Sequence, residues 1–312
     1  MKHTTTLVLT EALPAAGMGV LHGRAEVVIL SAPTQDELAR AVPRADGLVM
    51  VMEQPTLSAE LIALGKRLRI VCRCGAGYDN IDVDALTQRG IPLATTAGAS
   101  ADTVAEHAIY LMLALARRGP ALDRAVKAGA WPRGFGGVEL AGRTCALVGY
   151  GRIGRAIARR LAPFDMKLLI VDPLLPEAWP LEKALAQADF VVLACALTPQ
   201  TKRLIDAKAL EAMKRSAFLV NVARGAVVDE AALVAALEAG GLAGAGLDVL
   251  ETEPPRAHHP LLARDDVVLT PHVAAYIDTA YERVATACAR NALAGLEGGL
   301  ERACVVNAEV LR

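Results

Sequence analysis

The stretch CALVGYGRIG, residues 145–154, decides the fold of this chain. Its first four residues are apolar and typical of a buried β-strand, and the helix-forming segment RAIARRL follows the last glycine. Between them, Gly149, Gly151 and Gly154 form the pattern G-x-G-x-x-G. The first glycine permits a tight turn, the second lets the backbone approach a pyrophosphate, and the third allows close helix packing. Strand, turn and helix together predict a dinucleotide-binding unit.

The next apolar run ends at Asp172, about 20 residues after the glycines. A carboxylate in this place accepts hydrogen bonds from the adenosine ribose hydroxyls and repels a 2′-phosphate. Neither Pro173 nor Leu174 is the arginine that a phosphate would need, although Arg152 and Arg155 lie close in sequence. We therefore expect NAD as the cofactor, with NADP the less favoured alternative. The other interpretation is that Asp172 merely ends a strand.

Apolar runs and helical stretches alternate on both sides of this unit, which is typical of parallel sheets covered by helices. Helices are expected to begin at the N-caps Thr34 and Ser58, and a long Ala-rich helix at 101–118 places a domain boundary near residue 98. The sequence predicts an α/β protein with two doubly wound parallel sheets. The expected strands lie at 7–10, 27–30, 47–52 and 69–74, and then in TCALVG, LLIVD, FVVLA, AFLVNVA, AGLDV and VVLT.

Length and composition exclude several classes of protein. A chain of 312 residues exceeds one ordinary core and indicates two domains. Although 54% of the residues are hydrophobic, the longest apolar span, 108–116, is too short to cross a bilayer. The N-terminal stretch lacks the features of a signal peptide, so we expect a cytoplasmic protein. The net charge of −1 comes from interspersed residues of both signs, which gives no basic surface for nucleic acid or membrane.

The six cysteines are scattered, mostly in apolar runs, and indicate reduced, buried thiols. Cys72 and Cys74 form the only close pair, whereas structural zinc needs about four ligands. His258 and His259 lie in a Pro-rich loop, where adjacent histidines are more often solvated. We therefore expect no metal site.

Three charged residues, Arg224, Glu253 and His272, each follow an apolar run downstream of the glycines. The carboxyl ends of parallel strands meet at one edge of a sheet, so we expect all three beside a bound cofactor. His272 suits acid–base chemistry, and a carboxylate from Glu253 would fix its tautomer and raise its pKa. The planar guanidinium of Arg224 suits a carboxylate or a keto oxygen. Taken singly, each residue is also compatible with an ordinary polar or turn position.

With these residues in place, the chain resembles the D-isomer-specific 2-hydroxyacid dehydrogenase family, which includes phosphoglycerate dehydrogenases and glyoxylate/hydroxypyruvate reductases. The resemblance covers nearly the whole chain. It implies a Rossmann NAD-binding domain at 98–284 inserted into a flavodoxin-like catalytic domain at 1–97 and 285–312. It also implies a homodimer that uses the 101–118 helix and the loop around Trp131. The stretches that carry it are RCGAGYDNID (73–82), DTVAEHAIYLMLALAR (102–117), VELAGRTCALVGYGRIG (138–154), MKRSAFLVNVARGAVVDEAAL (213–233), GAGLDVLETEPP (244–255) and LTPHVA (269–274).

Site residues follow from the resemblance position by position. Arg224 matches the substrate-binding arginine, Glu253 the carboxylate of a Glu–His relay, and His272 the acid/base. The backbone amides of the loop Cys74, Gly75, Ala76 and Gly77 match those that bind the substrate carboxylate. The cofactor is expected to contact Gly149, Gly151, Arg152, Ile153, Asp172, Thr198, Ala223, Asp248 and His272.

The implied activity is hydride transfer between NAD(H) and a small 2-hydroxy acid or its 2-oxo partner. Two departures bear on the details. Residues 194–198, ACALT, lack the His and Pro of the His-x-Pro-Leu-Thr stretch that many members carry. Phosphoglycerate-oxidising members carry a segment that resembles Arg-Ser-x-Thr, where this chain has VMVMEQPT. Glu53 in this stretch would oppose a phosphate, although Arg73 would help to bind an anion.

A second functional class shares this fold, namely nicotinamide-sensing binding proteins that resemble transcriptional corepressors. The complete triad of Arg224, Glu253 and His272 favours the enzyme. The sequence does not decide which 2-hydroxy acid is used, or in which direction the reaction runs.

Overall fold

A computed structural model of the chain describes residues 5–134 and 136–311. The chain divides into two compact units, Met1–Ser100 with Tyr276–Arg312, and Ala101–Ala275. The sequence predicts that the chain passes from one domain to the other after residues 97 and 284. In the structure, the chain returns to the first unit between Ala275 and Tyr276, so the helix α11 (Asp278–Glu297) belongs entirely to the first unit.

The first unit is built on one parallel sheet of five strands in the order β2-β1-β3-β4-β5. This is the flavodoxin-like order, which confirms the predicted fold. Four strands coincide with expected runs, whereas β5 has only three residues and was not predicted from the sequence. The strands are β1 (Thr6–Leu9), β2 (Glu26–Ile29), β3 (Gly47–Met50), β4 (Ile70–Arg73) and β5 (Leu93–Thr95).

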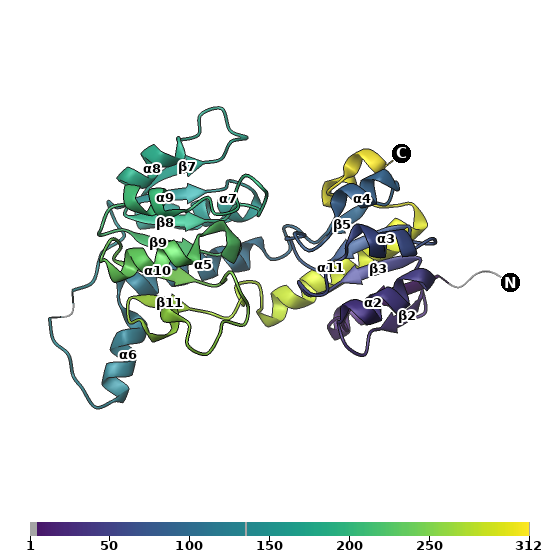
Figure 1. Cartoon of the computed structure of the whole chain (residues 1–312), viewed down its shortest axis with the longest axis horizontal. Helices are drawn as coiled ribbons and strands as arrows, with labels where there is room; N and C mark the ends of the chain where they lie inside the picture. The colour runs from purple at the N-terminus through teal and green to yellow at the C-terminus, as the bar shows by residue number, and fades with distance from the viewer. Residues whose placement is uncertain (1–4, 135, 312) are drawn as a thin grey trace. The chain divides into compact units, whose positions relative to one another are not determined.

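Helices cover both faces of this sheet (Figure 1). The hydroxyl of Thr34 accepts a hydrogen bond from the Glu37 amide, and that of Ser58 accepts one from the Leu61 amide, as the N-cap prediction requires. The helices are α1 (Ala15–Leu21), α2 (Gln35–Ala41), α3 (Ala59–Leu64), α4 (Val83–Gln88) and α11.

The segment CVVN returns to the first unit and closes the exposed edge of β5. Val305 pairs with Ala94 in an antiparallel bridge, and the Val306 amide donates to the Leu93 carbonyl at 2.9 Å. The side chain of Asn307 accepts from the Leu93 amide at 2.8 Å. These bonds satisfy backbone groups that an uncovered edge strand would leave unpaired.

The second unit contains a parallel sheet of six strands in the order β11-β10-β9-β8-β6-β7. All six predicted runs are strands. The strand β6 pairs with β7 on one side and with β8 on the other, so the direction in which the chain adds strands to the sheet reverses at β6. The glycine turn after β6 therefore lies at the switch point where such sheets bind ligands. The strands are β6 (Thr144–Val148), β7 (Lys167–Val171), β8 (Phe190–Leu193), β9 (Phe218–Asn221), β10 (Gly244–Leu247) and β11 (Val267–Leu269).

Two apolar cores lie on opposite faces of this sheet. The helices α5 and α7 pack on one face, and α8, α9 and α10 pack on the other (Figure 1). The helices are α5 (Ala101–Ala116), α6 (Gly119–Lys127), α7 (Arg152–Leu161), α8 (Leu181–Gln187), α9 (Ala207–Ala212) and α10 (Glu230–Glu238). Short 3₁₀ turns occur at Val42–Arg44, Ala162–Phe164, Gly225–Val227, Pro260–Ala263, Arg302–Cys304 and Ala308–Val310.

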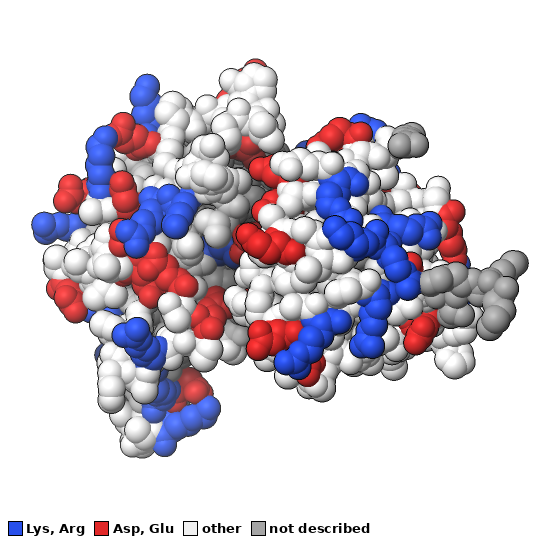
Figure 2. Space-filling model, turned by 45° about the vertical axis from the view of Figure 1, so that its right-hand side comes forward, with Lys and Arg blue, Asp and Glu red and all other residues white. Residues whose placement is uncertain are grey.

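The face drawn in Figure 2 carries acidic and basic side chains close to one another, with one band of basic side chains interrupted by acidic neighbours. Within the described ranges, no helix is both long enough and apolar enough to span a bilayer.

Candidate active site

The glycine turn after β6 has the geometry of a phosphate cradle. Gly149 has a φ of +94°, and a Cβ there would lie 2.6 Å from the Cys195 amide nitrogen. A Cβ on Gly154 would lie 2.1 Å from the Gly149 carbonyl oxygen, whereas a Cβ on Gly151 would meet nothing within 4 Å. The helix α7 starts without a side-chain cap. Its first amides and its positive dipole end therefore suit a pyrophosphate group.

Asp172 ties the end of β7 to this turn. Its Oδ2 accepts a hydrogen bond from the Tyr150 amide at 2.7 Å, and its Oδ1 accepts one from the Leu174 amide at 3.0 Å. Each carboxylate oxygen has two acceptor sites, so both can also receive ribose hydroxyls. The guanidinium of Arg155 lies 6.0 Å from the centre of the Tyr150 ring. The residues present therefore fit an adenosine dinucleotide.

The other predicted cofactor residues follow the carboxyl ends of strands in the same sheet. Thr198 lies in an exposed turn after β8, where its amide donates to the Thr201 hydroxyl at 2.7 Å. Ala223 is buried after β9, and its amide donates to the Asn221 side chain at 2.9 Å. In the first turn of α7, Arg152 is exposed and Ile153 is half-buried. Parallel pairing places these segments along one edge of the sheet.

Glu253 and His272 form the closest pair of ionisable groups at that edge. Oε2 of Glu253 lies 2.7 Å from Nδ1 of His272, and Oε1 accepts the Leu250 amide at 2.9 Å. The two side chains are 36% and 26% exposed, so the pair is held in place and still open to a ligand. The sequence prediction that these two residues meet is confirmed in geometry.

The backbone at His272 adopts the left-handed conformation, with φ at +54°. Its amide donates to the Asp248 carbonyl at 2.7 Å. Outside glycine this conformation costs about 1 kcal/mol, and residues held in it cluster at functional sites. The imidazole therefore takes its direction from two sources, the backbone turn and the contact with Glu253.

Arg224 reaches the same neighbourhood because the turn after β9 packs directly on the loop after β10. A Cβ on Gly225 would lie 2.0 Å from the Leu250 carbonyl, so only glycine allows this approach. The Nη1 atom of Arg224 donates to the Ala223 carbonyl at 2.9 Å. Arg224 also lowers the pKa of Glu253 through its charge, so the geometry brings all three predicted catalytic residues together.

The Glu253 carboxyl remains ionised in this setting. Burial alone would raise its pKa, but the hydrogen bond from His272, the Leu250 amide and the nearby positive charges outweigh that effect and lower it. An ionised carboxylate at Nδ1 requires a proton on that nitrogen. Nε2 is then the ring atom that can exchange a proton with a substrate.

Asp248 organises the loop that carries His272. Its Oδ1 accepts the Val273 amide and its Oδ2 the Ala274 amide, each at 2.9 Å. The same Oδ1 accepts the Thr270 hydroxyl at 2.6 Å. Although burial would raise the pKa of Asp248, hydrogen bonds from His107, Thr270 and the two amides lower it. Asp248 is buried and acts here as an acceptor for three groups of one loop.

Two members of this network, His107 and Thr270, were not among the residues expected from the sequence. Nε2 of His107, on α5, lies 2.8 Å from the Thr270 hydroxyl and 3.4 Å from Oδ1 of Asp248. The sequence pattern of the helix could have pointed to His107, because it is a polar residue at the margin of the apolar, buried face of α5. Its partner cannot be deduced without the fold.

The glycine-rich loop at 74–77 lies in the first unit, where β4 ends. The Cys74 amide donates to the Met50 carbonyl at 2.9 Å, and the Gly75 carbonyl accepts the Thr96 amide at 3.0 Å. Gly75 has a φ of +150°, which other residues rarely adopt. Ala76 and Gly77 are half-buried. The Gly75 amide also donates to the Arg73 carbonyl at 3.0 Å, so two of the four loop amides are already engaged and anion binding would fall to those of Ala76 and Gly77.

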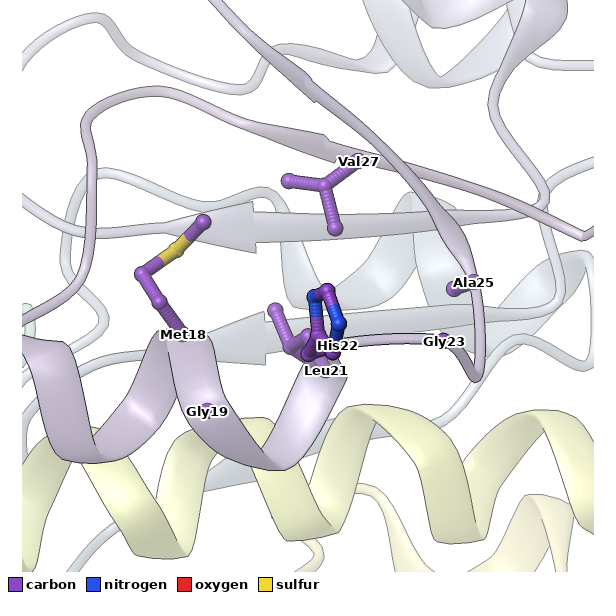
Figure 3. Close-up of a pocket in the computed structure, with 7 residues that line it drawn as sticks. All are labelled: Met18, Gly19, Leu21, His22, Gly23, Ala25 and Val27. Carbon is purple, nitrogen blue, oxygen red and sulfur yellow. The ribbon is translucent and has the colours of Figure 1, made fainter.

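The cysteines and the remaining ionisable groups form no further site of this kind within the described residues. All six cysteines are free thiols, and burial raises the pKa of Cys145 to about 12. Among the described residues, no group of three or more His, Cys, Asp or Glu side chains could hold a metal ion. A hollow of about 400 Å³ lies between α1 and β2. Figure 3 shows the seven residues that line it, among which His22 is the only ionisable one. One imidazole beside apolar groups does not make a catalytic site.

Comparisons with known proteins agree with this geometry. Residues 109–274 match the model of the "D-isomer specific 2-hydroxyacid dehydrogenase, NAD binding domain". A glyoxylate reductase of Pyrococcus furiosus is 39% identical over 324 residues, which cover 97% of this chain and 96% of the relative. A D-3-phosphoglycerate dehydrogenase of Archaeoglobus fulgidus is 42% identical over 260 residues, which cover 80% of this chain but only 49% of that longer protein.

A solved structure gives the same result. An NADPH-dependent glyoxylate/hydroxypyruvate reductase from Sinorhizobium meliloti, in complex with NADP and malonate, superposes with a TM-score of 0.86 at 30% identity, over 99% of both chains. The segment that matches the family model, residues 109–274, includes the glycine turn, Asp172, Arg224, Glu253 and His272. The chain therefore belongs to the D-isomer-specific 2-hydroxyacid dehydrogenase family.

Proposed function

We propose that the protein is a nicotinamide-dependent dehydrogenase that interconverts a small 2-oxo acid and the corresponding D-2-hydroxy acid. The contact between Glu253 and His272, at 2.7 Å, carries this proposal. It supplies an oriented proton donor and acceptor at the same sheet edge as the glycine cradle. The names of the relatives support the substrate class.

In the proposed reaction, the glycine turn and Asp172 would hold NAD(H), which would supply or accept the hydride at the substrate C2. During reduction, Nε2 of His272 donates a proton to the C2 oxygen, and during oxidation it removes that proton. The Glu253 carboxylate keeps Nδ1 protonated and stabilises the imidazolium form. The ring therefore stays in one orientation throughout the cycle.

Arg224 and the amides of Ala76 and Gly77, in the loop at 74–77, are proposed to bind the substrate carboxylate. A guanidinium pairs with a carboxylate through two parallel hydrogen bonds, and glycine-rich backbone allows close approach of an anion. Arg224 is half-buried and is fixed through the Ala223 carbonyl. These groups recognise features that every 2-oxo acid shares.

NAD(H) is proposed as the preferred cofactor because Asp172 is held at the ribose position by the Tyr150 and Leu174 amides. A fixed carboxylate there repels the 2′-phosphate of NADP. The relative from Sinorhizobium meliloti is described as NADPH-dependent, so the family as a whole does not decide this preference.

A homodimer that works in the cytoplasm is proposed as the form of the enzyme. In the second unit, α6 has no buried residues, and Trp131 in the loop after it is 76% exposed (Figure 1). A large aromatic side chain so exposed is typical of a protein interface. Sedimentation of the wild type and of Trp131→Glu tests this: dimer and monomer are expected respectively, and a monomeric wild type would contradict it.

The test of the activity is loss of the NADH absorbance band with purified protein and glyoxylate, hydroxypyruvate or pyruvate. Turnover with at least one of these acids is expected, with faster rates for NADH than for NADPH. NADH binding without turnover of any of them would contradict the proposal and favour a nicotinamide-sensing role.

A further inference from the structure

A partly buried ion pair lies beside the loop at 74–77, outside the groups assigned so far. Nη2 of Arg73 donates to Oε1 of Glu53 at 2.6 Å. The Arg73 side chain is only 4% exposed, whereas that of Glu53 is 38% exposed. The arginine is therefore inside the first unit, and the carboxylate is at its surface.

Arg73 makes several hydrogen bonds within the first unit. Its Nη1 donates to the Val51 carbonyl at 2.5 Å and to the Cys74 carbonyl at 2.8 Å. The buried Nε makes no hydrogen bond within the described residues and is closed to solvent. The donors of Arg73 that make hydrogen bonds face carbonyl groups and Glu53, and its help in binding a substrate anion stays a prediction. These bonds fix the ends of β3 and β4.

Glu53 has acceptor capacity left. Arg73 occupies one oxygen, and no hydrogen bond to the other oxygen occurs within residues 5–134 and 136–311. Burial raises the pKa of the Tyr276 phenol to about 12, and the negative charge of Glu53 adds to this effect. The Tyr276 hydroxyl donates to Sδ of Met52 at 3.4 Å. Tyr276 and Met52 are thus in contact, and no second cation pairs with Glu53 within the described residues.

This carboxylate also lies close to the proposed carboxylate-binding loop. A Cβ on Gly75 would lie 3.5 Å from Nη1 and 3.7 Å from Nη2 of Arg73, and Nη2 holds Glu53. The Gly75 backbone and Glu53 are thus separated by one guanidinium group. A small 2-oxo acid bound to the loop amides would bring its C3 substituent within reach of Glu53.

We propose that Glu53, held by Arg73, selects the substrate side group: it accepts a hydrogen bond from a hydroxyl or other donor on C3 and excludes phosphate or carboxylate there. This inference rests on the proposed function. It assigns the protein to unphosphorylated 2-hydroxy acids with a short donor-bearing side group. Like charges in a partly desolvated site repel strongly, whereas an ionised acceptor strengthens a hydrogen bond.

Glu53→Gln is the informative variant, because the amide oxygen can still accept from Arg73 while the negative charge is lost. The charge of Arg73 then lacks a counterion, so a side-group anion is attracted instead of repelled. Glu60→Gln is the matched control, since Glu60 is exposed on α3 and forms no ion pair with Arg73 within the described residues. It removes the same charge from the same unit.

The experiment measures kcat/KM for hydroxypyruvate, for its phosphate ester and for oxaloacetate. The wild type is expected to prefer hydroxypyruvate over both anions by roughly tenfold or more, and Glu53→Gln to reduce this preference by about tenfold. Glu60→Gln is expected to leave it unchanged. Equal preference in the wild type, or an unchanged ratio in Glu53→Gln, would overturn the inference.

A binding measurement separates this inference from the reaction itself. Calorimetry with D-glycerate and with D-3-phosphoglycerate, in the presence of NADH, gives the same selectivity without turnover. If the selectivity shifts in Glu53→Gln but no 2-oxo acid is reduced, the proposed reaction fails and the assignment of Glu53 stands. If turnover occurs and the selectivity does not shift, the assignment of Glu53 fails alone.

Discussion

The Thr270 hydroxyl donates its only proton to Oδ1 of Asp248 at 2.6 Å, and this fixes what His107 must do. Nε2 of His107 lies 2.8 Å from the same hydroxyl oxygen. Since that oxygen can then only accept, Nε2 carries a proton and donates it. Three side chains from α5, the end of β10 and the end of β11 thus form one directed chain of hydrogen bonds beneath His272.

Replacement of Thr270 tests this chain. Thr270→Val removes the hydroxyl while keeping the shape, which leaves the His107 proton only its longer contact with Oδ1 of Asp248, at 3.4 Å, and removes the short bond that this oxygen accepts from Thr270. We expect a loss of about 1–3 kcal/mol in stability. We also expect lower kcat with little change in the affinity for NADH, because the His272 loop loses one of its anchors. Thr270→Ser, which keeps the hydroxyl, should restore most of the rate; equal loss in both variants would show that hydrogen bonding is not the cause.

Cofactor choice is predicted to depend on Asp172. Asp172→Ser removes the fixed negative charge at the ribose position, so the ratio of kcat/KM for NADPH to that for NADH should rise at least about tenfold. Glu177→Gln, an exposed carboxylate a few residues away, is the control and should leave the ratio unchanged. A ratio that stays constant in Asp172→Ser would show that another group reads the ribose.

Acid stability is predicted to depend on Glu253, whose folded pKa is lowered from the usual 4.5. A carboxylate with a depressed folded pKa stabilises the fold above its unfolded pKa, and that contribution disappears as the pH falls through the folded value. The melting temperature of the wild type should therefore fall more steeply between about pH 5 and pH 3 than that of Glu253→Gln. Parallel curves for the two proteins would contradict the lowered pKa.

Much of the fold follows from the sequence, because a strand followed by a glycine turn and a helix leaves few alternatives. The register of parallel strands then explains why Arg224, Glu253 and His272 meet: each follows a strand of the same sheet. The strand β5 escaped prediction because three residues are too few to show a periodic pattern. The second segment of the first unit starts at Tyr276 and not at residue 285 as predicted, since the apolar face of α11 packs on α1 and β4.

Side-chain partners across the fold could not be predicted in the same way. The role of Arg73 depends on the pairing of β3 with β4, which sets Met50 opposite Arg73 and turns the guanidinium toward the end of β3. His107 is separated from Thr270 by 163 positions, so only the packing of α5 against the sheet reveals their contact. Sequence motifs identify the residues of a site, whereas the packing of the fold determines which of those residues already bond to other parts of the protein.

The most direct test of the account is the turnover of His272→Asn with NADH and the best 2-oxo acid. Asparagine tolerates the left-handed backbone found at this position, so the variant should fold and bind NADH nearly as the wild type does. Without a proton donor at the C2 oxygen, kcat should fall by about 10²- to 10⁴-fold. A variant that binds NADH and keeps the full rate would contradict the assignment of His272 as the acid/base.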